Sequence, residues 1–420
     1  GLSLAANLAE EGGVKVAVVD GKLEDDWPNN YGVWIAELER AGFPDCASPR
    51  WERTAVYVGK RGEKKTFDLP YGRLDRKKVK ALLLERCRAS GNVCLEKTFV
   101  ESVDEVSQAH SSVSTKNGKT FQARVVVDAT GHDLGFVKFE DGHNPGYQAA
   151  YGIEATVESH PFPVGEMLLM DYRDDHMQGT PEDRAESEEV PLFLYAMPTS
   201  ETEIFLEETS LIASPPVEFD YLKERLYKRL DNLGVTVKSV AEEEYCLIPM
   251  GGKKPKRGQR ILAFGGAAGL VHPSTGYMVS NMLFMSQKMS TWIASRLRDT
   301  ERSADDIAAD VWEELWSETS SKQRDFHIFG GDFEATLQLS ELREFFSAFF
   351  DIPVHLWTKF LAFDLVHPFD RLQYGLSIWF KTSNRIRAKL LADGATRGQW
   401  PLLRSVLPFN SDDQGRQDLR

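Results

Sequence analysis

The spacing of apolar residues predicts a helix, a turn and a buried strand at the start of the chain. Small and apolar residues recur at helical spacing over 1–11, and Gly12-Gly13 ends that pattern. A β-branched run over 14–19 follows and closes at Asp20. This order is typical of the second half of a dinucleotide-binding βαβ unit.

In this interpretation Gly1 is the last glycine of a GxGxxG motif, and Asp20 is the acid that holds a ribose about 20 residues further on. We expect the first strand and the other phosphate-binding glycines to lie upstream of residue 1. An ordinary helix and strand with a surface Asp explain the same pattern about as often. The half-motif therefore needs support from elsewhere in the chain.

Two further strand-to-glycine turns supply that support. A strand predicted at 125–127 runs directly into Asp128-Ala-Thr-Gly131. A buried strand near 260–264 leads into a second turn, and a helix is expected to begin at 274–276, where backbone N–H groups suit a pyrophosphate. The cofactor-binding candidates of this second turn are Gly265, Gly266, Gly269, Pro273 and Gly276. Three such turns predict FAD as the cofactor.

Periodicity places the remaining elements. Helices are predicted at 77–89, 220–233, 277–297 and 303–321, and strands at 195–197 and 203–209. The acidic, proline-bounded segment 177–191 is predicted to be an exposed loop.

We therefore expect an α/β fold of two domains, a Rossmann-like dinucleotide-binding domain and a substrate domain of mixed sheet and helices. The expected division is 1–150 and 251–300 for FAD-binding segments, 151–250 for the substrate sheet and 301–420 for a helical, membrane-associated region.

Composition narrows the function. The chain carries 64 acidic and 50 basic residues, a net charge of −14, which disfavours nucleic-acid binding. No apolar run approaches the ~20 residues of a membrane-spanning helix. The four cysteines form no CxxC pair and no metal spacing, so we expect reduced thiols and no metal site.

Seven sequence blocks resemble the signatures of the plant and cyanobacterial lycopene cyclases, in the family's order and within a resemblance that covers 1 to about 410. They are 27–34 (Trp-Pro-Asn-Asn-Tyr-Gly-Val-Trp), 145–153 (Pro-Gly-Tyr-Gln-Ala-Ala-Tyr-Gly-Ile), 170–176 (Met-Asp-Tyr-Arg-Asp-Asp-His), 193–198 (Phe-Leu-Tyr-Ala-Met-Pro), 205–209 (Phe-Leu-Glu-Glu-Thr), 248–252 (Ile-Pro-Met-Gly-Gly) and 272–278 (His-Pro-Ser-Thr-Gly-Tyr-Met). The last two blocks resemble the β-ring enzymes more than the ε-ring enzymes.

The resemblance implies an isomerase that cyclises the ends of acyclic lycopene to β-rings with no net redox change. It implies reduced FAD as a stabiliser of the carbocation, with NADPH as the reductant that keeps the flavin reduced. It also implies a peripheral position on a plastid membrane and a complex with other carotenoid enzymes.

A carboxylic acid kept protonated by apolar surroundings is the natural donor of a proton to an alkene. In an extended strand Glu207 and Glu208 point to opposite faces, so only one of them reaches a pocket. By analogy with the family we place Glu207 as the acid and Glu208 as its support or as the base. An exposed acidic edge is the alternative for this pair.

Further residues are candidates for binding FAD, for binding substrate or for relaying a proton. Arg73 is predicted to reach the FAD phosphates or else to cap a surface helix. The substrate-binding candidates are Tyr31, Trp34, Tyr147, Phe205 and His272. The alternatives are that the loop around Trp34 packs in the hydrophobic core and that His272 has a structural role. The polar cluster at 171–176 is a proton relay or, as we favour, an ion-pair set.

The aromatic-rich stretch 341–394 predicts a helical surface that dips into a bilayer, with a helical core as the alternative. Gly265-Gly266 replaces the Gly-Asp usual in flavin monooxygenases, which favours a cyclase. The other functions that remain open are an FAD-dependent monooxygenase or epoxidase of isoprenoids, an ε-cyclase, a cyclase of epoxidised carotenoids, and a non-enzymatic carotenoid or flavin carrier.

Overall fold

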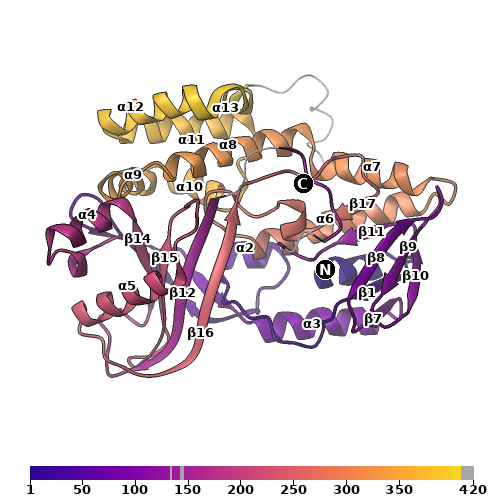
Figure 1. The fold of residues 1–420 in the computed structure, drawn as a ribbon, viewed down its shortest axis with the longest axis horizontal. Helices are drawn as coiled ribbons and strands as arrows, with labels where there is room; N and C mark the ends of the chain where they lie inside the picture. Colours follow the sequence, from indigo (N-terminus) through magenta and orange to yellow (C-terminus); the bar gives the residue numbers. More distant parts are fainter. Residues whose placement is uncertain (133–134, 142–145, 408–420) are drawn as a thin grey trace.

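The computed structural model describes residues 1–132, 135–141 and 146–407. Its centre is a seven-stranded sheet with the order β16-β12-β15-β14-β13-β4-β5 (Figure 1). The strands are β4 (Arg53–Val58), β5 (Glu63–Phe67), β12 (Gly146–Val157), β13 (Glu166–Asp171), β14 (Leu192–Pro198), β15 (Glu203–Ser210) and β16 (Val237–Met250). Pro145, the first residue of one signature block, lies outside the described residues.

The glycine-turn segments come together beside this sheet. β1 (Val16–Val19) pairs in parallel with β7 (Val93–Glu96), and β11 (Val126–Asp128) pairs in parallel with β17 (Ile261–Ala263). Around them lie α1 (Leu2–Glu10), α3 (Arg76–Ala89), α6 (Val279–Leu297), α7 (Ala304–Leu315) and the antiparallel strands β8 (Val100–Glu105), β9 (Ser111–Thr115) and β10 (Thr120–Ala123). A small sheet of β2 (Gly32–Trp34), β6 (Tyr71–Leu74) and β3 (Ala47–Trp51) precedes α3, and α2 (Ile35–Arg40) follows β2.

Helices cover the seven-stranded sheet on both faces. α5 (Phe219–Asn232) buries Leu222, Leu226 and Leu230 against one face. The other face packs against α8 (Glu318–Glu334), α9 (Leu339–Asp351) and α10 (Val354–Leu361). Figure 1 shows an outer layer over these, formed by α11 (Pro368–Lys381), α12 (Asn384–Asp393) and α13 (Gln399–Val406).

Most of the predicted elements are confirmed, but segment 177–191 is not a loop. It contains α4 (Pro181–Glu189), which begins at a Thr180 side-chain cap, with Pro181 in its first turn and acids at 182 and 183. These are strong helix-start signals that outweigh a polar composition. The helix predicted over 303–321 is also two helices, α7 and α8, which the Ser317 cap separates.

The first part of the aromatic stretch 341–394 corrects a second prediction. The side chains of Phe345, Phe346, Phe349, Trp357 and Phe360 are buried in the core against the sheet, so they do not form a membrane-facing surface. The later part of the same stretch does expose apolar side chains, among them Phe369 and Phe380 of α11 and Leu391 of α12 on the outer layer. No helix in the part of the chain that the structure describes is long and apolar enough to cross a bilayer.

Strands β4 and β5 join the large sheet through β13, although the sequence assigns 53–67 to the FAD-binding segments. The substrate sheet therefore draws on residues outside 151–250. β12 also begins at Gly146, ahead of the expected boundary.

Candidate active site

A cavity of about 390 Å³ lies between one face of the large sheet, the helices α8 to α10 and the segment 271–279. Its walls are mainly aromatic and aliphatic, with few polar groups. Its polar lining includes Asn30, Tyr71, Tyr195, Glu207, Thr209, Glu244, Tyr277 and Glu334. A mainly apolar cavity with some polar groups suits a hydrocarbon substrate.

Glu207 points from β15 into this cavity. Its carboxylate accepts a hydrogen bond of 2.8 Å from the Thr209 hydroxyl. Burial, and secondly the negative charge of Glu244, raise the pKa of Glu207 to about 8, against a smaller opposing effect of the Thr209 bond. This raised pKa favours the protonated form of Glu207 at neutral pH, beside the aromatic side chains of the cavity.

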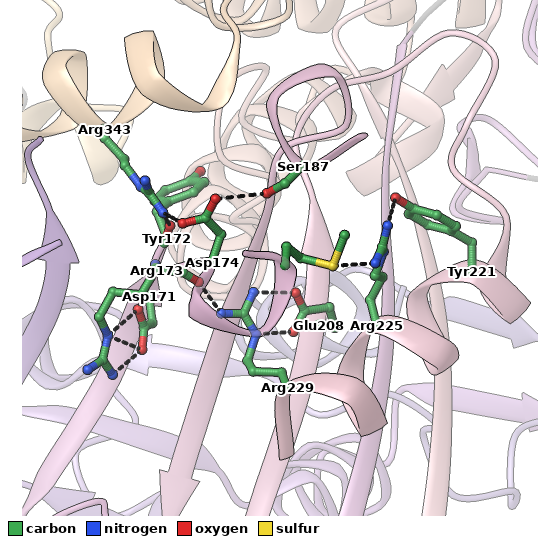
Figure 2. A network of polar contacts seen from close by, with 11 residues as sticks. Asp171, Tyr172, Arg173, Asp174, Ser187, Glu208, Tyr221, Arg225, Arg229 and Arg343 are labelled. Atoms are coloured by element: carbon green, nitrogen blue, oxygen red, sulfur yellow. Dashed lines mark hydrogen bonds and ion pairs between the residues drawn. The ribbon is translucent and has the colours of Figure 1, made fainter. Parts of the chain in front are cut away.

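Glu208 lies on the opposite face of the sheet and has no exposed surface. Arg229 of α5 holds it with two bonds, 2.7 Å from Nε to Oε2 and 2.5 Å from Nη2 to Oε1 (Figure 2). The structure thus confirms that the two glutamates face apart. It does not bring Glu208 to the cavity, which argues against Glu208 as a base that touches substrate.

The cluster at 171–176 belongs to the same face as Glu208. Asp171 pairs with Arg173, and Asp174 pairs with Arg343, as Figure 2 shows. Burial, followed by the charge of Arg229, lowers the pKa of His176 to about 2, so His176 stays neutral. These contacts favour the ion-pair interpretation over a proton relay.

Three tyrosines line the cavity beside Glu207, and the sequence analysis missed them as site residues. The Tyr195 hydroxyl donates to that of Tyr71 over 3.3 Å, and Tyr71 and Tyr277 are joined over 3.1 Å. Tyr195 lies directly across from Glu207 in the β14–β15 pair. Burial holds the pKa of all three phenols well above the usual range, so they remain neutral.

A second carboxyl in the cavity, Glu244 of β16, was also missed. The Asn30 backbone N–H donates to both of its oxygens at 3.1 Å, and Asn30 Nδ2 donates to Oε2 at 2.8 Å. Its position among three consecutive glutamates hid it, because such a run is usually a solvated edge. Alternation along β16 turns Glu243 to the opposite face, whereas Glu242, on the same face as Glu244, is more exposed and pairs with Arg76 at 3.2 Å.

Arg73 contacts the residues around Glu244 and does not contact the glycine turns. Its Nε donates to Asn30 Oδ1 at 2.9 Å, and its Nη1 pairs with Glu154 at 2.6 Å. Its guanidinium also lies 5.7 Å from the centre of the Phe205 ring. The structure therefore does not bring Arg73 to a phosphate-binding position, which corrects that prediction.

The predicted substrate-binding residues separate into two groups. Tyr31 and Phe205 line the cavity. Trp34 packs behind it, edge-on to Tyr71 at 4.8 Å, and His272 is buried with Nε2 2.8 Å from the Phe360 carbonyl oxygen. Tyr147 lies on β12 outside the cavity lining. The structure thus favours structural roles for Trp34 and His272.

The three glycine-turn segments fit a dinucleotide cofactor. A Cβ on Gly1 would lie 3.5 Å from Ala129, and one on Gly266 would lie 3.1 Å from the carbonyl carbon of Gly131. Gly131, Gly265 and Gly269 have φ near +70°, which favours glycine. Segments far apart in sequence therefore meet as close-packed turns, and His132 and 274–279 continue from them into the cavity wall.

The other predicted cofactor-binding residues differ in their contacts and in their exposure. The Asp128 carboxylate shapes its own turn, because it accepts from Thr130 N at 3.0 Å and from Phe136 N at 2.9 Å. Asp20 is exposed at the end of β1, and Pro273 is buried. Gly276 lines the cavity. Among the described residues no group of His, Cys, Asp or Glu is placed to hold a metal ion.

The fold matches that of known flavoproteins. A geranylgeranyl bacteriochlorophyll reductase-like protein from Thermoplasma acidophilum matches with a TM-score of 0.66 at 13% identity, over 93% of this chain and 96% of that one. A halogenase solved in complex with FAD matches with a TM-score of 0.56 at 10% identity, over 96% and 91%. These likenesses show the fold alone, and they confirm the predicted flavoprotein fold class.

The sequence comparisons are more specific. The family model described as lycopene cyclase protein matches residues 1–388. The chloroplastic lycopene beta cyclase of Arabidopsis thaliana is 40% identical over 409 residues, 97% of this chain and 80% of that protein. The chromoplastic capsanthin/capsorubin synthase of Citrus sinensis is 40% identical over 363 residues, 86% and 72%. The chain belongs to the lycopene cyclase family.

Proposed function

We propose that this chain is a lycopene β-cyclase, which closes the ends of acyclic lycopene to β-rings. Family membership and relatives named lycopene beta cyclase support the reaction class. The observation that carries the proposal is the Glu207 carboxyl, protonated at neutral pH and directed into an aromatic cavity.

In this mechanism Glu207 gives its proton to the terminal double bond of lycopene. The next double bond attacks the resulting cation and closes the six-membered ring. Aromatic faces attract a cation electrostatically and exclude water that would quench it. The cavity supplies such faces from the sheet and from α9 and α10, namely Phe193, Phe205, Phe346, Phe349, Phe350 and Phe360.

The cofactor proposed for this site is FAD, with NADPH as the reductant that keeps it reduced. The residues that would hold it are Gly1, Asp20, Gly131, Gly265, Gly266, Gly269 and Gly276. Reduced FAD, when bound, supplies negative charge that favours a cation nearby. Asp128 would contribute to FAD binding indirectly, because its carboxylate accepts hydrogen bonds from Thr130 N and Phe136 N and so sets the shape of one turn.

The outer helical layer is the proposed contact with a plastid membrane. Its exposed apolar side chains are Phe369, Leu372, Leu376, Phe380, Leu391, Trp400, Leu403 and Leu407. Lys381 and Arg387 lie beside them, and a basic, apolar helical surface suits the interface of an anionic bilayer. Cosedimentation with anionic vesicles is expected to fall several-fold when Phe380 and Trp400 are both changed to Ser. Unchanged cosedimentation would contradict this part of the proposal.

The function is tested by expressing the protein in bacteria that accumulate lycopene and identifying the extracted pigment. The native protein is expected to yield β-carotene. Glu207→Gln is expected to lower that yield by about 100-fold or more, the usual range for loss of a general acid. Glu243→Gln is the matched control, because Glu243 is on the exposed face of β16, bonded to Tyr151 and Lys223.

Unchanged lycopene with folded, flavin-loaded native protein would contradict the proposal. Oxygen uptake on carotenoids would then favour the monooxygenase alternative. A non-enzymatic carrier would bind pigment equally well with Gln at position 207. A ketocarotenoid made from epoxidised substrates in preference to lycopene would point to the reaction named for the capsanthin/capsorubin synthases.

A further inference from the structure

One row of residues crosses four strands at the floor of the cavity. Tyr195 of β14 pairs with Glu207 of β15, Glu207 pairs with Gly152 of β12, and Gly152 pairs with Glu244 of β16. Residues directly opposite one another in a sheet share a face. Glu207 and Glu244 therefore face the same cavity, with only a glycine between them.

Gly152 has no side chain that would separate the carboxyls of Glu207 and Glu244 in the cavity. A Cβ at position 152 would lie 2.7 Å from Cζ of Phe205, closer than real Cβ atoms come. The Phe205 ring thus lies over the glycine and forms an apolar floor between Glu207 and Glu244. No side chain of β12 separates the acids at this level.

The two carboxyls have different hydrogen-bond partners. Glu244 accepts from the backbone and side-chain N–H groups of Asn30, and donors of this kind stabilise a carboxylate. Arg73 donates to the Asn30 side-chain oxygen and so turns the amide NH₂ toward Glu244. Within residues 1–132, 135–141 and 146–407, the Thr209 hydroxyl is the one hydrogen-bond partner of the Glu207 side chain. Burial raises the pKa of Glu244 as well, but the Asn30 donors oppose that rise, so the arrangement favours the proton on Glu207 and leaves Glu244 as the acceptor.

We propose that Glu244 is the base of the cyclisation, the group that removes the proton from the ring carbon after closure. This inference rests on the proposed function and assigns to Glu244 the role that the sequence analysis gave to Glu208. Its position would decide which C–H bond is broken, and hence the ring type.

The steps balance. The Glu207 O–H bond breaks as a C–H bond forms on the terminal alkene carbon, and the ring C–C bond forms from the second alkene. The C–H bond beside the new cation then breaks, its electrons form the ring double bond, and the proton goes to Glu244. Transfer of that proton from Glu244 to Glu207 restores the pair. No electron is gained or lost overall.

The test compares native protein, Glu244→Gln and the control Glu243→Gln, each loaded with reduced flavin and given lycopene in vesicles. A second substrate carries deuterium at the carbon that loses its proton. Glu244→Gln is expected to cyclise about 100-fold more slowly, to keep its flavin and melting temperature, and to show a larger deuterium isotope effect than native protein. Glu243→Gln is expected to match native protein.

A native rate for Glu244→Gln would overturn the proposal. So would a slower rate with an unchanged isotope effect, which would mean that Glu244 only positions other groups. If Glu244→Gln does not fold, Glu244→Asp retains a displaced carboxylate, and its isotope effect must rise for the proposal to stand. Native protein that makes no β-carotene would refute the proposed function itself, a result distinct from these.

Discussion

The two faces of the large sheet treat neighbouring glutamates in opposite ways. On the face toward α5, Glu208 meets the Arg229 guanidinium through two charged hydrogen bonds (Figure 2). On the face toward α8 to α10, Glu207 meets aromatic rings, a hydroxyl and another acid. One carboxyl stabilises the fold as an ion, and the other stores a proton. The surroundings of the two carboxyls, and not their residue type, separate the ion-paired acid from the acid that we propose as the proton donor.

The largest effect is expected at Glu208. Glu208→Gln leaves the buried Arg229 without its counter-ion, and the loss of one partner of a buried pair costs about 3–5 kcal/mol. Urea unfolding should show this loss in the free energy of unfolding. The protein that remains folded should cyclise lycopene at the native rate. A large loss of activity with unchanged stability would instead return Glu208 to the chemistry.

The cyclisation rate is expected to depend on pH through Glu207. Because the folded-state pKa of Glu207 is raised to about 8, its acid form is present below that pH. The cyclisation rate should fall about tenfold per pH unit above the pKa. Glu244, Cys246 and Tyr195 also face Glu207, so the midpoint belongs to this group of residues. A rate that rises with pH up to 9 would contradict an acid role.

The raised pKa of Glu207 also makes the free energy of unfolding depend on pH. The folded protein holds the Glu207 proton that the unfolded chain releases above about pH 4.5. The contribution of Glu207 to the free energy of unfolding is therefore greatest below about pH 4.5. It falls as the pH rises from there to about 8. Glu207→Gln should flatten this part of the stability curve.

A smaller effect is expected at Gly152. Its replacement by Ala pushes against the Phe205 ring, and overpacking of this kind costs about 1–3 kcal/mol. Thermal unfolding and the cyclisation rate together should show lower stability and slower turnover. Gly165→Ala is the control, since no atom lies within 4 Å of a Cβ there. Equal stability of the two variants would contradict the close approach of Phe205.

The sequence predicted elements better than it predicted the site. Periodicity located α1, α3, α5 and α6, and alternation placed Glu207 and Glu208 on opposite faces. It did not reveal Glu244 or Tyr195, because their roles depend on a register across four strands that only the folded sheet creates. Arg73 and the first part of the aromatic stretch were misplaced for a related reason: composition shows what a residue can contact, and tertiary packing decides what it does contact.

The central claim is that Glu207 carries a proton at neutral pH. Infrared difference spectroscopy of the folded protein, with Glu207→Gln as the subtraction, measures this directly. We expect a protonated-carboxyl C=O band at pH 7 that is absent from the variant and disappears with a midpoint near pH 8. A carboxylate signal at pH 7 with no such band would contradict the account.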